Sequence, residues 1–338
     1  MKAALFEKSH HITITQRNLR VPKSDEVVVR IVACGVCGTD LHIVEGSSRS
    51  TPPVILGHEY TGIIEECGSD VHEFSAGDSV AVDPNISCGA CYFCRRGEVH
   101  LCENLRALGV DIDGGMAELC LVPQKQLYRL PNSISAEKAA FIEPLSCAVH
   151  GIDRARFRPG DTVAILGGGT VGLLLLQLAR ISGASRVIVV EPQEWKRKIA
   201  TNVGADFVCD PNKEKVTDMI RDLTRVGADV VLECVGKPET IALGFEIARR
   251  GGTLELFGVC PVGTKVPFEP NNVYFKELTI VGSYVNPHTF ERAISLLAEG
   301  RISIEQFVIK RYPLDGVHDA LTSLREGTTI KNLIIPAL

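Results

Sequence analysis

Residues 162–172 read TVAILGGGTVG, and this stretch decides the fold of the second half of the chain. The apolar run 162–166 predicts a buried strand, and the apolar residues within 170–182 predict a buried helix. Between them Gly167, Gly169 and Gly172 form a G-x-G-x-x-G motif. Glycines at these places permit a tight turn, a close approach of a pyrophosphate, and close packing of helix on strand. The motif predicts a dinucleotide site, with an ordinary tight turn as the alternative.

An acidic residue stands nineteen positions after the last glycine of the motif, at the end of a predicted strand over 186–190. This residue, Glu191, could accept hydrogen bonds from both hydroxyls of an adenosine ribose, whereas a 2′-phosphate would meet its negative charge. We therefore expect NAD, and Lys196 and Arg197 just downstream keep NADP open as the alternative. The predicted cofactor contacts are Gly167, Gly169, Thr170, Val171, Gly172, Glu191 and Lys196.

The two halves of the chain differ in pattern. From residue 161 onward strands alternate with helical sequence, which predicts a doubly wound parallel sheet. Residues 1–148 read as short strands between Gly- and Pro-rich turns, which predicts a small β-barrel with irregular loops. We expect a first domain over 1–148, completed by 286–338, and a dinucleotide-binding domain over 149–285. The predicted strands are 27–32, 54–56, 62–65, 79–82, 162–166, 186–190, 229–234, 253–257, 277–283 and 331–335, and a tail helix is predicted over 289–299.

Four cysteines stand close together in the segment CGACYFCRRGEVHLC. The spacing C-x2-C-x2-C-x7-C delivers four thiolates to one point, which suits tetrahedral zinc. A disulfide pair or chance clustering is the alternative. Since all four places on such an ion are taken by protein, it could hold a loop but not perform chemistry, and a catalytic metal must lie elsewhere. The predicted ligands are Cys88, Cys91, Cys94 and Cys102.

Three other segments could form a second, open metal site. They are GVCGTDLH with Cys37, GHE with His58, and EPLSC with Glu143. A thiolate, an imidazole and a carboxylate would bind zinc and leave one place for substrate. Taken singly, Cys37 could be a buried thiol, His58 a core histidine and Glu143 a helix cap, and spacing alone does not bring them together.

The composition is that of an ordinary globular enzyme. The 338 residues include 45% hydrophobic and 23% charged residues, and the net charge of −5 argues against nucleic acid or an anionic membrane as a partner. The longest apolar run, 171–179, is far too short to cross a bilayer, and the start MKAALFEKSHHITIT lacks the features of a signal peptide. We therefore expect a cytoplasmic protein whose twelve cysteines are metal ligands and buried thiols.

Five motifs occur in the order found in one enzyme family: GVCGTD, GHEYTG, the four-cysteine segment, EPLSCAVH, and GGGTVG followed by an acid. Over essentially its whole length the chain resembles the zinc-dependent medium-chain dehydrogenase/reductase family. It resembles the sorbitol and polyol dehydrogenase branch more than the simple alcohol branch. The resemblance implies an α/β fold with a GroES-like catalytic domain, a Rossmann coenzyme domain and an active site in the cleft between them. It also implies a homodimer or homotetramer, with the late strand often mediating dimer pairing.

The same resemblance implies the ligands of the catalytic zinc. Cys37 and His58 would bind it, and Glu143 stands at the position of the third protein ligand. Glu59 contacts the ligands in some members and binds zinc itself in others. The four-cysteine segment would carry a structural zinc, so that each chain holds two zinc ions.

The resemblance also implies a proton route. Zinc acts as a Lewis acid on the substrate hydroxyl, and the nicotinamide accepts the hydride. In related enzymes a hydroxyl at the position of Thr39 passes the proton through the nicotinamide ribose toward the histidine at the position of His42. A turn hydroxyl and an exposed loop histidine are the plainer interpretations of these two residues.

The substrate implied by the resemblance is small. We expect NAD-dependent oxidation of a secondary hydroxyl on a polyol, cyclitol or sugar derivative, giving the ketone. Ile43-Val44-Glu45 stands where the sorbitol enzymes place aromatic residues, which leaves sorbitol itself open. A threonine-like amino alcohol, which the loop GTDLH favours, and a simple alcohol are the alternatives. A non-catalytic dinucleotide-binding module and a zinc ribbon on nucleic acid are alternatives from other classes, and the second lacks a basic surround.

Overall fold

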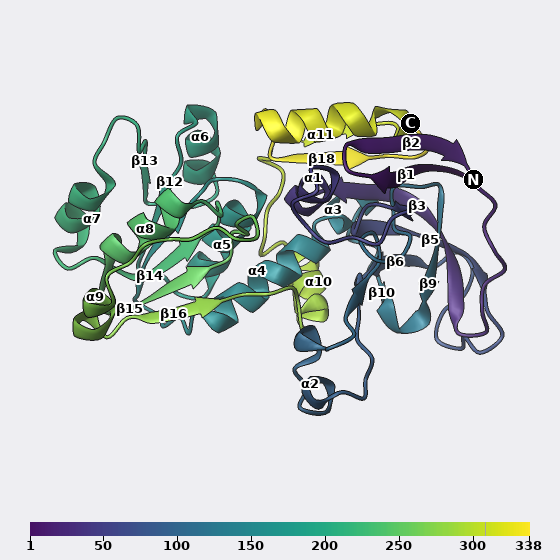
Figure 1. Ribbon diagram of the computed structural model, residues 1–338, viewed down its shortest axis with the longest axis horizontal. Helices are drawn as coiled ribbons and strands as arrows, with labels where there is room; N and C mark the ends of the chain where they lie inside the picture. The colour runs from purple at the N-terminus through teal and green to yellow at the C-terminus, as the bar shows by residue number, and fades with distance from the viewer. Residues whose placement is uncertain (308) are drawn as a thin grey trace. The chain divides into compact units, whose positions relative to one another are not determined.

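The chain folds into two compact units. The computed structural model describes residues 1–307 and 309–338. The first unit comprises Met1–Pro144, Pro287–Gly300 and Phe307–Leu338, and the second comprises Leu145–Asn286 and Arg301–Gln306. In Figure 1 the purple and yellow ends of the chain belong to the first unit and the green middle belongs to the second.

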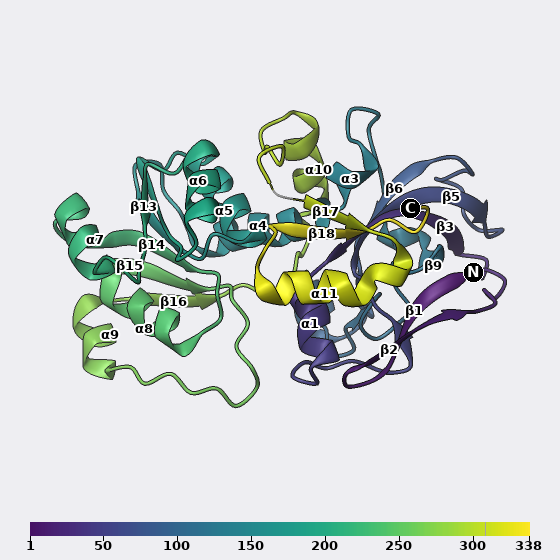
Figure 2. The same ribbon diagram turned by 90° about the horizontal axis from the view of Figure 1, so that it is seen from above.

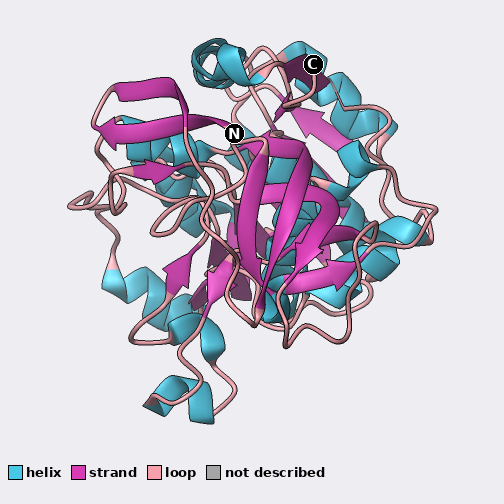
Figure 3. Cartoon of the chain, turned by 90° about the vertical axis from the view of Figure 1, so that its right-hand side faces the viewer, coloured by secondary structure: helices cyan, strands magenta, loops and turns pink. Residues whose placement is uncertain are grey.

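The first unit is rich in strands, which are magenta in Figure 3. They are β1 (Lys2–Lys8), β2 (His11–Gln16), β3 (Glu26–Val36), β4 (Val54–Ile55), β5 (Glu59–Cys67), β6 (Ser79–Val82), β7 (Asn85–Ile86), β8 (Arg106–Ala107), β9 (Leu119–Pro123), β10 (Leu127–Arg129), β17 (Ile309–Tyr312) and β18 (Lys331–Ile334). Its helices and 3-10 turns are α1 (Gly38–Val44), α2 (Tyr92–Arg95), η1 (Val99–Leu101), η2 (Gln124–Gln126), α3 (Ala136–Ala139), α10 (Phe290–Ala298), η3 (Leu314–Gly316) and α11 (Val317–Glu326).

Strand β3 is the centre of the first unit. It pairs antiparallel with β5, β9 and β18, in a sheet of order β10-β6-β5-β3-β18-β17 with β9 off that path. Because β3 is covered on both faces, its sequence EVVVRIVACGV is apolar almost throughout rather than alternating. A second sheet has the order β2-β1-β4, and the β1–β2 hairpin was missing from the predicted set. The last strand of the chain, β18, lies beside β3 in the larger sheet.

The second unit is a doubly wound parallel sheet of order β13-β12-β11-β14-β15-β16. The order reverses at β11, so right-handed crossovers place α5 and α6 on one side of the sheet and α8 and α9 on the other, as Figure 2 shows. This confirms the predicted fold class. The elements are α4 (Ile142–Arg154, which begins in the first unit), β11 (Thr162–Leu166), α5 (Thr170–Ile181), β12 (Arg186–Val190), α6 (Glu194–Asn202), β13 (Phe207–Cys209), α7 (Val216–Thr224), β14 (Ala228–Glu233), α8 (Pro238–Ile247), β15 (Ala248–Leu256), α9 (Pro270–Lys276) and β16 (Thr279–Gly282).

No helix among the described residues is both long and apolar enough to cross a membrane.

Candidate metal and dinucleotide sites

The first candidate site lies in the first unit, where β3 ends and β5 begins. Cys37 follows the last residue of β3, Glu59 is the first residue of β5, and His58 directly precedes it. One ligand atom from each of these three residues lies within 4.8 Å of the others. Sulfur, imidazole nitrogen and carboxylate oxygen are zinc donors, and the three side chains that carry them converge at one place. The group therefore fits a divalent ion.

A glycine positions His58. Gly57 has a φ of +93°, a backbone conformation that favours glycine. A Cβ at this position would also lie 2.6 Å from the Sγ atom of Cys34 and 2.8 Å from the Cγ atom of Met116. The turn that brings His58 toward Cys37 therefore requires glycine both for its conformation and for its space.

Asp40 orients two members of the group, although the sequence prediction gave it no role. Its Oδ2 atom accepts a hydrogen bond of 2.9 Å from the Cys37 N–H, and its Oδ1 atom lies 3.4 Å from the Nδ1 atom of His58. Because Nδ1 faces this carboxylate, Nε2 is the nitrogen left for a metal. Burial by itself would lower the pKa of His58, but the Asp40 carboxylate and the Cys37 sulfur raise this pKa well above its ordinary value.

Glu59 faces a cation that the sequence prediction missed. Its Oε2 atom forms an ion pair with the Nζ atom of Lys331, from β18, and the two side chains are 1% and 3% exposed. Burial lowers the pKa of Lys331, but the carboxylate of Glu59 and the sulfur of Cys37 outweigh it, so the pKa is raised. The signal in the sequence was a single lysine at the start of the apolar strand KNLI.

Glu143 is buried in the first turn of α4 and adds to the negative charge that acts on Lys331. Among the described residues, the donor group within 4.8 Å consists of Cys37, His58 and Glu59, and it does not include Glu143. The structure thus brings three of the four predicted ligands together. The role of Glu143 as a ligand stays a prediction.

Thr39 and His42 lie on α1, directly after Cys37. They are three residues apart on a helix, so their side chains share one face. The Oγ1 atom of Thr39 lies 3.8 Å from the Sγ atom of Cys37, and the half-buried His42 uses its carbonyl to accept the N–H groups of Ser47 and Ser48. The proton route through Thr39 and His42 stays a prediction.

The second candidate metal site is the four-cysteine segment. The Sγ atom of Cys102 accepts hydrogen bonds from the N–H groups of Cys88 and Asn104, at 3.2 and 3.3 Å. Backbone N–H groups, first that of Ala90, lower the pKa of Cys88 to about 6, whereas burial and neighbouring thiols raise the pKa of Cys94 to about 11. Such unequal pKa values arise when thiols share one small space, and a metal ion would replace their protons. The four sulfurs that lie within 4.8 Å of one another belong to Cys88, Cys91, Cys94 and Cys102.

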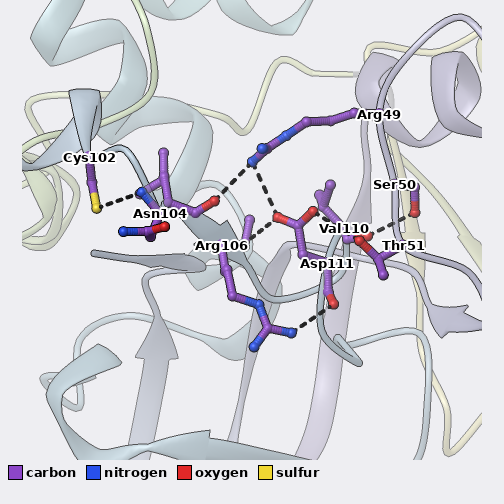
Figure 4. A network of polar contacts seen from close by, with 10 residues as sticks. Arg49, Ser50, Thr51, Cys102, Asn104, Arg106, Val110 and Asp111 are labelled. Carbon is purple, nitrogen blue, oxygen red and sulfur yellow. Dashed lines mark hydrogen bonds and ion pairs between the residues drawn. The ribbon is translucent and has the colours of Figure 1, made fainter. Parts of the chain in front are cut away.

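A polar network holds the chain just after Cys102 (Figure 4). At its centre the Oδ2 atom of Asp111 pairs with the Nη2 atom of Arg49 at 3.2 Å and accepts the Ala107 N–H at 2.9 Å. Arg49 also donates to the carbonyl of Leu105 at 3.2 Å. The loop that closes the four-cysteine segment is therefore tied to the chain that follows α1.

The third candidate site lies in the second unit, between β11 and α5. Gly167 has a φ of +107°, and a Cβ on Gly172 would overlap the carbonyl oxygen of Gly167. A Cβ on Gly169 would meet nothing within 4 Å, so the backbone there is open. Gly169 is followed by Thr170 and Val171, the first residues of α5, whose N-terminus carries partial positive charge. This loop fits a pyrophosphate group.

Glu191 closes this site at the end of β12. It is buried, and its carboxylate accepts the N–H groups of Gly168 and Gln193, at 2.8 and 2.9 Å. The carboxylate is therefore held in place before any ligand binds. A ligand phosphate close to it would meet a fixed negative charge.

The two downstream cations differ in their surroundings. Arg197 donates to the carbonyl of Glu191 at 2.7 Å and pairs with Asp210 at 3.2 Å, and its side chain is 12% exposed. Lys196 extends over the ring of Trp195, with its Nζ atom 5.4 Å from the ring centroid. Arg197 is thus held by a hydrogen bond and an ion pair within the protein. The contact that the structure records for the Lys196 ammonium is with the ring of Trp195. The role of Lys196 at the cofactor stays a prediction.

Known families match both units of the chain. The family described as Alcohol dehydrogenase GroES-like domain matches residues 23–132, and the family described as Zinc-binding dehydrogenase matches residues 170–299. These two ranges contain Cys37, His58, Glu59, the four cysteines and the start of α5.

Curated proteins and solved structures match along nearly the full length. D-arabinitol dehydrogenase 1 of Uromyces fabae is 33% identical, covering 99% of this chain and 97% of the relative. L-threonine 3-dehydrogenase of Pyrococcus abyssi is 37% identical, covering 92% of this chain and 91% of the relative. A crystal structure of a Sinorhizobium meliloti 1021 protein bound to NADP has a TM-score of 0.96 and 43% identity, covering 99% of both chains.

Proposed function

Since the chain belongs to the zinc-dependent medium-chain alcohol dehydrogenase family, we propose that it oxidises a secondary hydroxyl of a polyol, cyclitol or sugar derivative to the ketone, with NAD as hydride acceptor. The family, the fold class with its GroES-like domain, and the enzyme class of zinc-containing alcohol or polyol dehydrogenase are confirmed. The substrate within that class and the choice between NAD and NADP are proposals.

The observation that carries the substrate proposal is the pairing of Lys331 with Glu59. An amino-acid substrate such as threonine brings its own carboxylate, which calls for a cation at the site. Lys331 is buried and already paired, so it does not offer that charge. A polyol brings only hydroxyls, which are neutral and need no such cation.

A second candidate substrate is threonine, because the L-threonine 3-dehydrogenase of Pyrococcus abyssi is 37% identical to this chain. The D-arabinitol relative is 33% identical but spans a larger share of the chain. Identity of this size does not separate the two substrate classes. The charge at the site favours the polyol.

The proposed chemistry divides between an ion and the protein. Bound zinc would act as a Lewis acid toward the substrate hydroxyl. Cys37, His58 and Glu59 would hold the ion, and Asp40 would orient His58 through Nδ1. Thr39 would accept the hydroxyl proton and pass it toward His42. Glu143 would supply a further carboxylate ligand to the ion.

The proposal of NAD is supported by the buried, fixed carboxylate of Glu191 and by the engagement of Arg197 with Asp210. The NADP in the Sinorhizobium meliloti structure makes NADP the alternative. Residues Gly167, Gly169, Thr170, Val171 and Gly172 would hold the pyrophosphate, with Lys196 at the edge of the site.

We also propose a homodimer or homotetramer working in the cytoplasm, with domains at 1–148 plus 286–338 and at 149–285. Strand β16 is the outer strand of its sheet, and Ile280 and Tyr284 are exposed on and beside it, together with Tyr274 and Phe275 of α9. An apolar outer strand of this kind is suited to pairing with a second copy. Light scattering of an Ile280→Lys variant tests this, and an unchanged mass would contradict it.

The function is tested with a panel of polyols, inositols, amino alcohols and primary alcohols, each offered with NAD and with NADP while reduced coenzyme is followed by absorbance. We expect the highest kcat/KM with NAD and a polyol, cyclitol or sugar derivative. Turnover of threonine alone, or of simple primary alcohols alone, would overturn the proposed substrate class.

A further inference from the structure

A cavity in the first unit is separate from the three sites described above. It measures about 540 Å³ and is lined by residues of β9, of the chain between β2 and β3, and of the chain around β8. None of the described residues that line it belongs to the candidate metal groups or to the dinucleotide loop. Cavities of a few hundred cubic ångströms are the usual size of sites for small molecules. This cavity therefore has room for a ligand of its own.

Much of the lining is apolar. Leu119 and Leu121 stand two apart on β9, so both side chains lie on the same face of this strand. Ile86, Leu108 and Ile112 line the cavity as well. Walls of this kind favour a ligand with an apolar body, because the ligand removes its own apolar surface from water there.

The charged part of the lining is mainly positive, although the chain as a whole carries a net charge of −5. It consists of four cations and two carboxylates, which are Arg17, Arg20, Lys23, Arg106, Glu26 and Asp113. The cations therefore exceed the carboxylates by two. A local excess of positive charge on an acidic protein attracts anions to this place.

Both carboxylates of the lining are already engaged. Glu26 is buried and accepts two hydrogen bonds from Arg20, at 2.6 and 2.7 Å, which lower its pKa to about 2. Asp113 accepts the N–H of Ile55 through Oδ1 at 2.9 Å, and its Oδ2 atom lies 3.6 Å from the Nη1 atom of Arg17. That distance is longer than a hydrogen bond, so the donors of Arg17 stay available.

Arg106 has the least engaged guanidinium of the lining. Its Nη2 atom donates to the backbone carbonyl of Asp111 at 3.3 Å, as the dashed line in Figure 4 shows. Among the described residues no carboxylate lies within ion-pair distance of it, and its side chain is exposed. Because Arg106 contacts Asp111 and Arg17 lies near Asp113, two residues further along, the two guanidiniums belong to the same side of the cavity. Guanidinium groups match carboxylate and phosphate oxygens in geometry and charge.

We propose that this cavity binds a small organic anion, whose carboxylate or phosphate group pairs with Arg106 and Arg17 while its apolar body lies against Leu119 and Leu121. The site is distinct from the metal group, and the ligand is neither the substrate nor the coenzyme. The inference does not depend on the proposed function.

The test uses four probes that separate charge from apolar body. Octanoate and octyl phosphate have both, octanol has only the apolar body, and inorganic phosphate has only the charge. Each is titrated into the full-length protein by calorimetry, without coenzyme and below its micelle concentration. The proteins are wild type, Arg106→Gln, Arg17→Gln and Cys37→Ser, with Arg325→Gln as the matched control, because Arg325 is an exposed arginine of the same unit that lies outside the cavity.

We expect octanoate or octyl phosphate to bind wild type with one site per chain, and at least about tenfold more tightly than octanol or inorganic phosphate. The better of the two anions identifies the head group. Arg106→Gln should weaken its binding by about tenfold or more, since a hydrogen bond between two charged groups is lost. Arg325→Gln and Cys37→Ser should bind it as wild type does.

Three outcomes would overturn the proposal: no binding of either anion, equal binding of octanol, or unchanged affinity in a folded Arg106→Gln variant. Loss of binding in Cys37→Ser would place the anion at the metal group and would also contradict it. If Arg106→Gln does not fold, Arg17→Gln decides by the same criterion. None of these titrations needs turnover, so failure of every polyol in the activity panel would refute the proposed function and leave this test intact.

Discussion

The Oδ1 atom of Asp40 lies 3.4 Å from the Nδ1 atom of His58, while the other oxygen of the same carboxylate accepts the N–H of Cys37. One buried carboxylate thus contacts two candidate ligands, one just after β3 and one just before β5. In Asp40→Asn the shape and the helix cap are kept but the charge is lost. We expect zinc affinity to fall by about 10- to 100-fold, the usual effect of removing a partner of a ligand histidine.

Chelator competition with total zinc analysis measures this effect. The loss should be confined to one of the two zinc ions per chain, and far-UV circular dichroism should not change. Unchanged affinity for both ions would show that the Asp40 carboxylate does not support the site.

Thr39→Ala tests the proton route. The hydroxyl of Thr39 lies 3.8 Å from the Cys37 sulfur and shares a helix face with His42. If the hydroxyl carries the proton, its removal should lower kcat by about 100-fold, as for the loss of a general base, while zinc content stays at the wild-type level. Thr39→Ser is the matched control and should retain most of the activity. Equal turnover in Thr39→Ala and wild type would refute the relay.

Glu191→Ser tests the coenzyme choice. The carboxylate is held by the N–H groups of Gly168 and Gln193. Its charge therefore stays where we expect the adenosine ribose of the coenzyme to bind. Its removal should lower kcat/KM for NAD and raise kcat/KM for NADP. The ratio of the two values should change by about 10-fold or more, because hydrogen bonds to a charged group are lost. The control is Glu194→Ser, an exposed acid nearby that forms a surface pair with Lys198. An unchanged ratio in Glu191→Ser would mean that another residue selects the coenzyme.

Removal of each metal site should have a distinct consequence. Cys94→Ser breaks the four-cysteine group, and we expect one zinc ion per chain to be lost together with a lower thermal midpoint, because this ion would hold a loop with little secondary structure. Cys37→Ser should also lose one zinc ion, with activity lost and the midpoint changed much less. Zinc analysis and calorimetry of the two variants check this. Equal thermal effects would contradict the division into structural and catalytic ions.

The second unit could be predicted closely from the sequence. Buried parallel strands give continuous apolar runs, so the predicted 162–166 and 186–190 coincide with β11 and β12. The strand predicted over 253–257 misses the first residues of β15. This strand begins at Ala248, which pairs with Ala228 before a bulge. The four-cysteine group could also be predicted, since its ligands are close along the chain.

The candidate catalytic site could be predicted only in part. Cys37 and His58 stand in motifs, but Lys331 meets Glu59 through the pairing of β18 and β5 with opposite edges of β3. That pairing brings together residues 35, 59 and 331, which are far apart in the sequence, and no local pattern encodes it. The β1–β2 hairpin was missed for a related reason: its strands are partly exposed, which weakens the apolar signal.

Glu255 provides a test of stability against pH. It lies on β15, fully buried, and neither carboxylate oxygen has a hydrogen-bond partner. Burial raises its pKa from an ordinary 4.5 to about 8, although the charge of Arg154 acts in the opposite direction. Below pH 4.5 the carboxyl is protonated in both the folded and the unfolded state. Between pH 4.5 and 8 the unfolded state releases the proton and the folded state keeps it, so the free energy of unfolding falls with rising pH. The loss amounts to about 3–5 kcal/mol by pH 8.

In Glu255→Gln this loss should be absent. The difference in unfolding free energy between the variant and wild type should therefore grow in favour of the variant from pH 4.5 to pH 8 and stay constant above it. Urea unfolding at a series of pH values measures this difference, with Glu246→Gln, on the exposed side of α8, as the control that should show no such trend. A difference independent of pH would show that Glu255 is ionised in the folded protein, since only a carboxyl kept neutral by burial produces the slope.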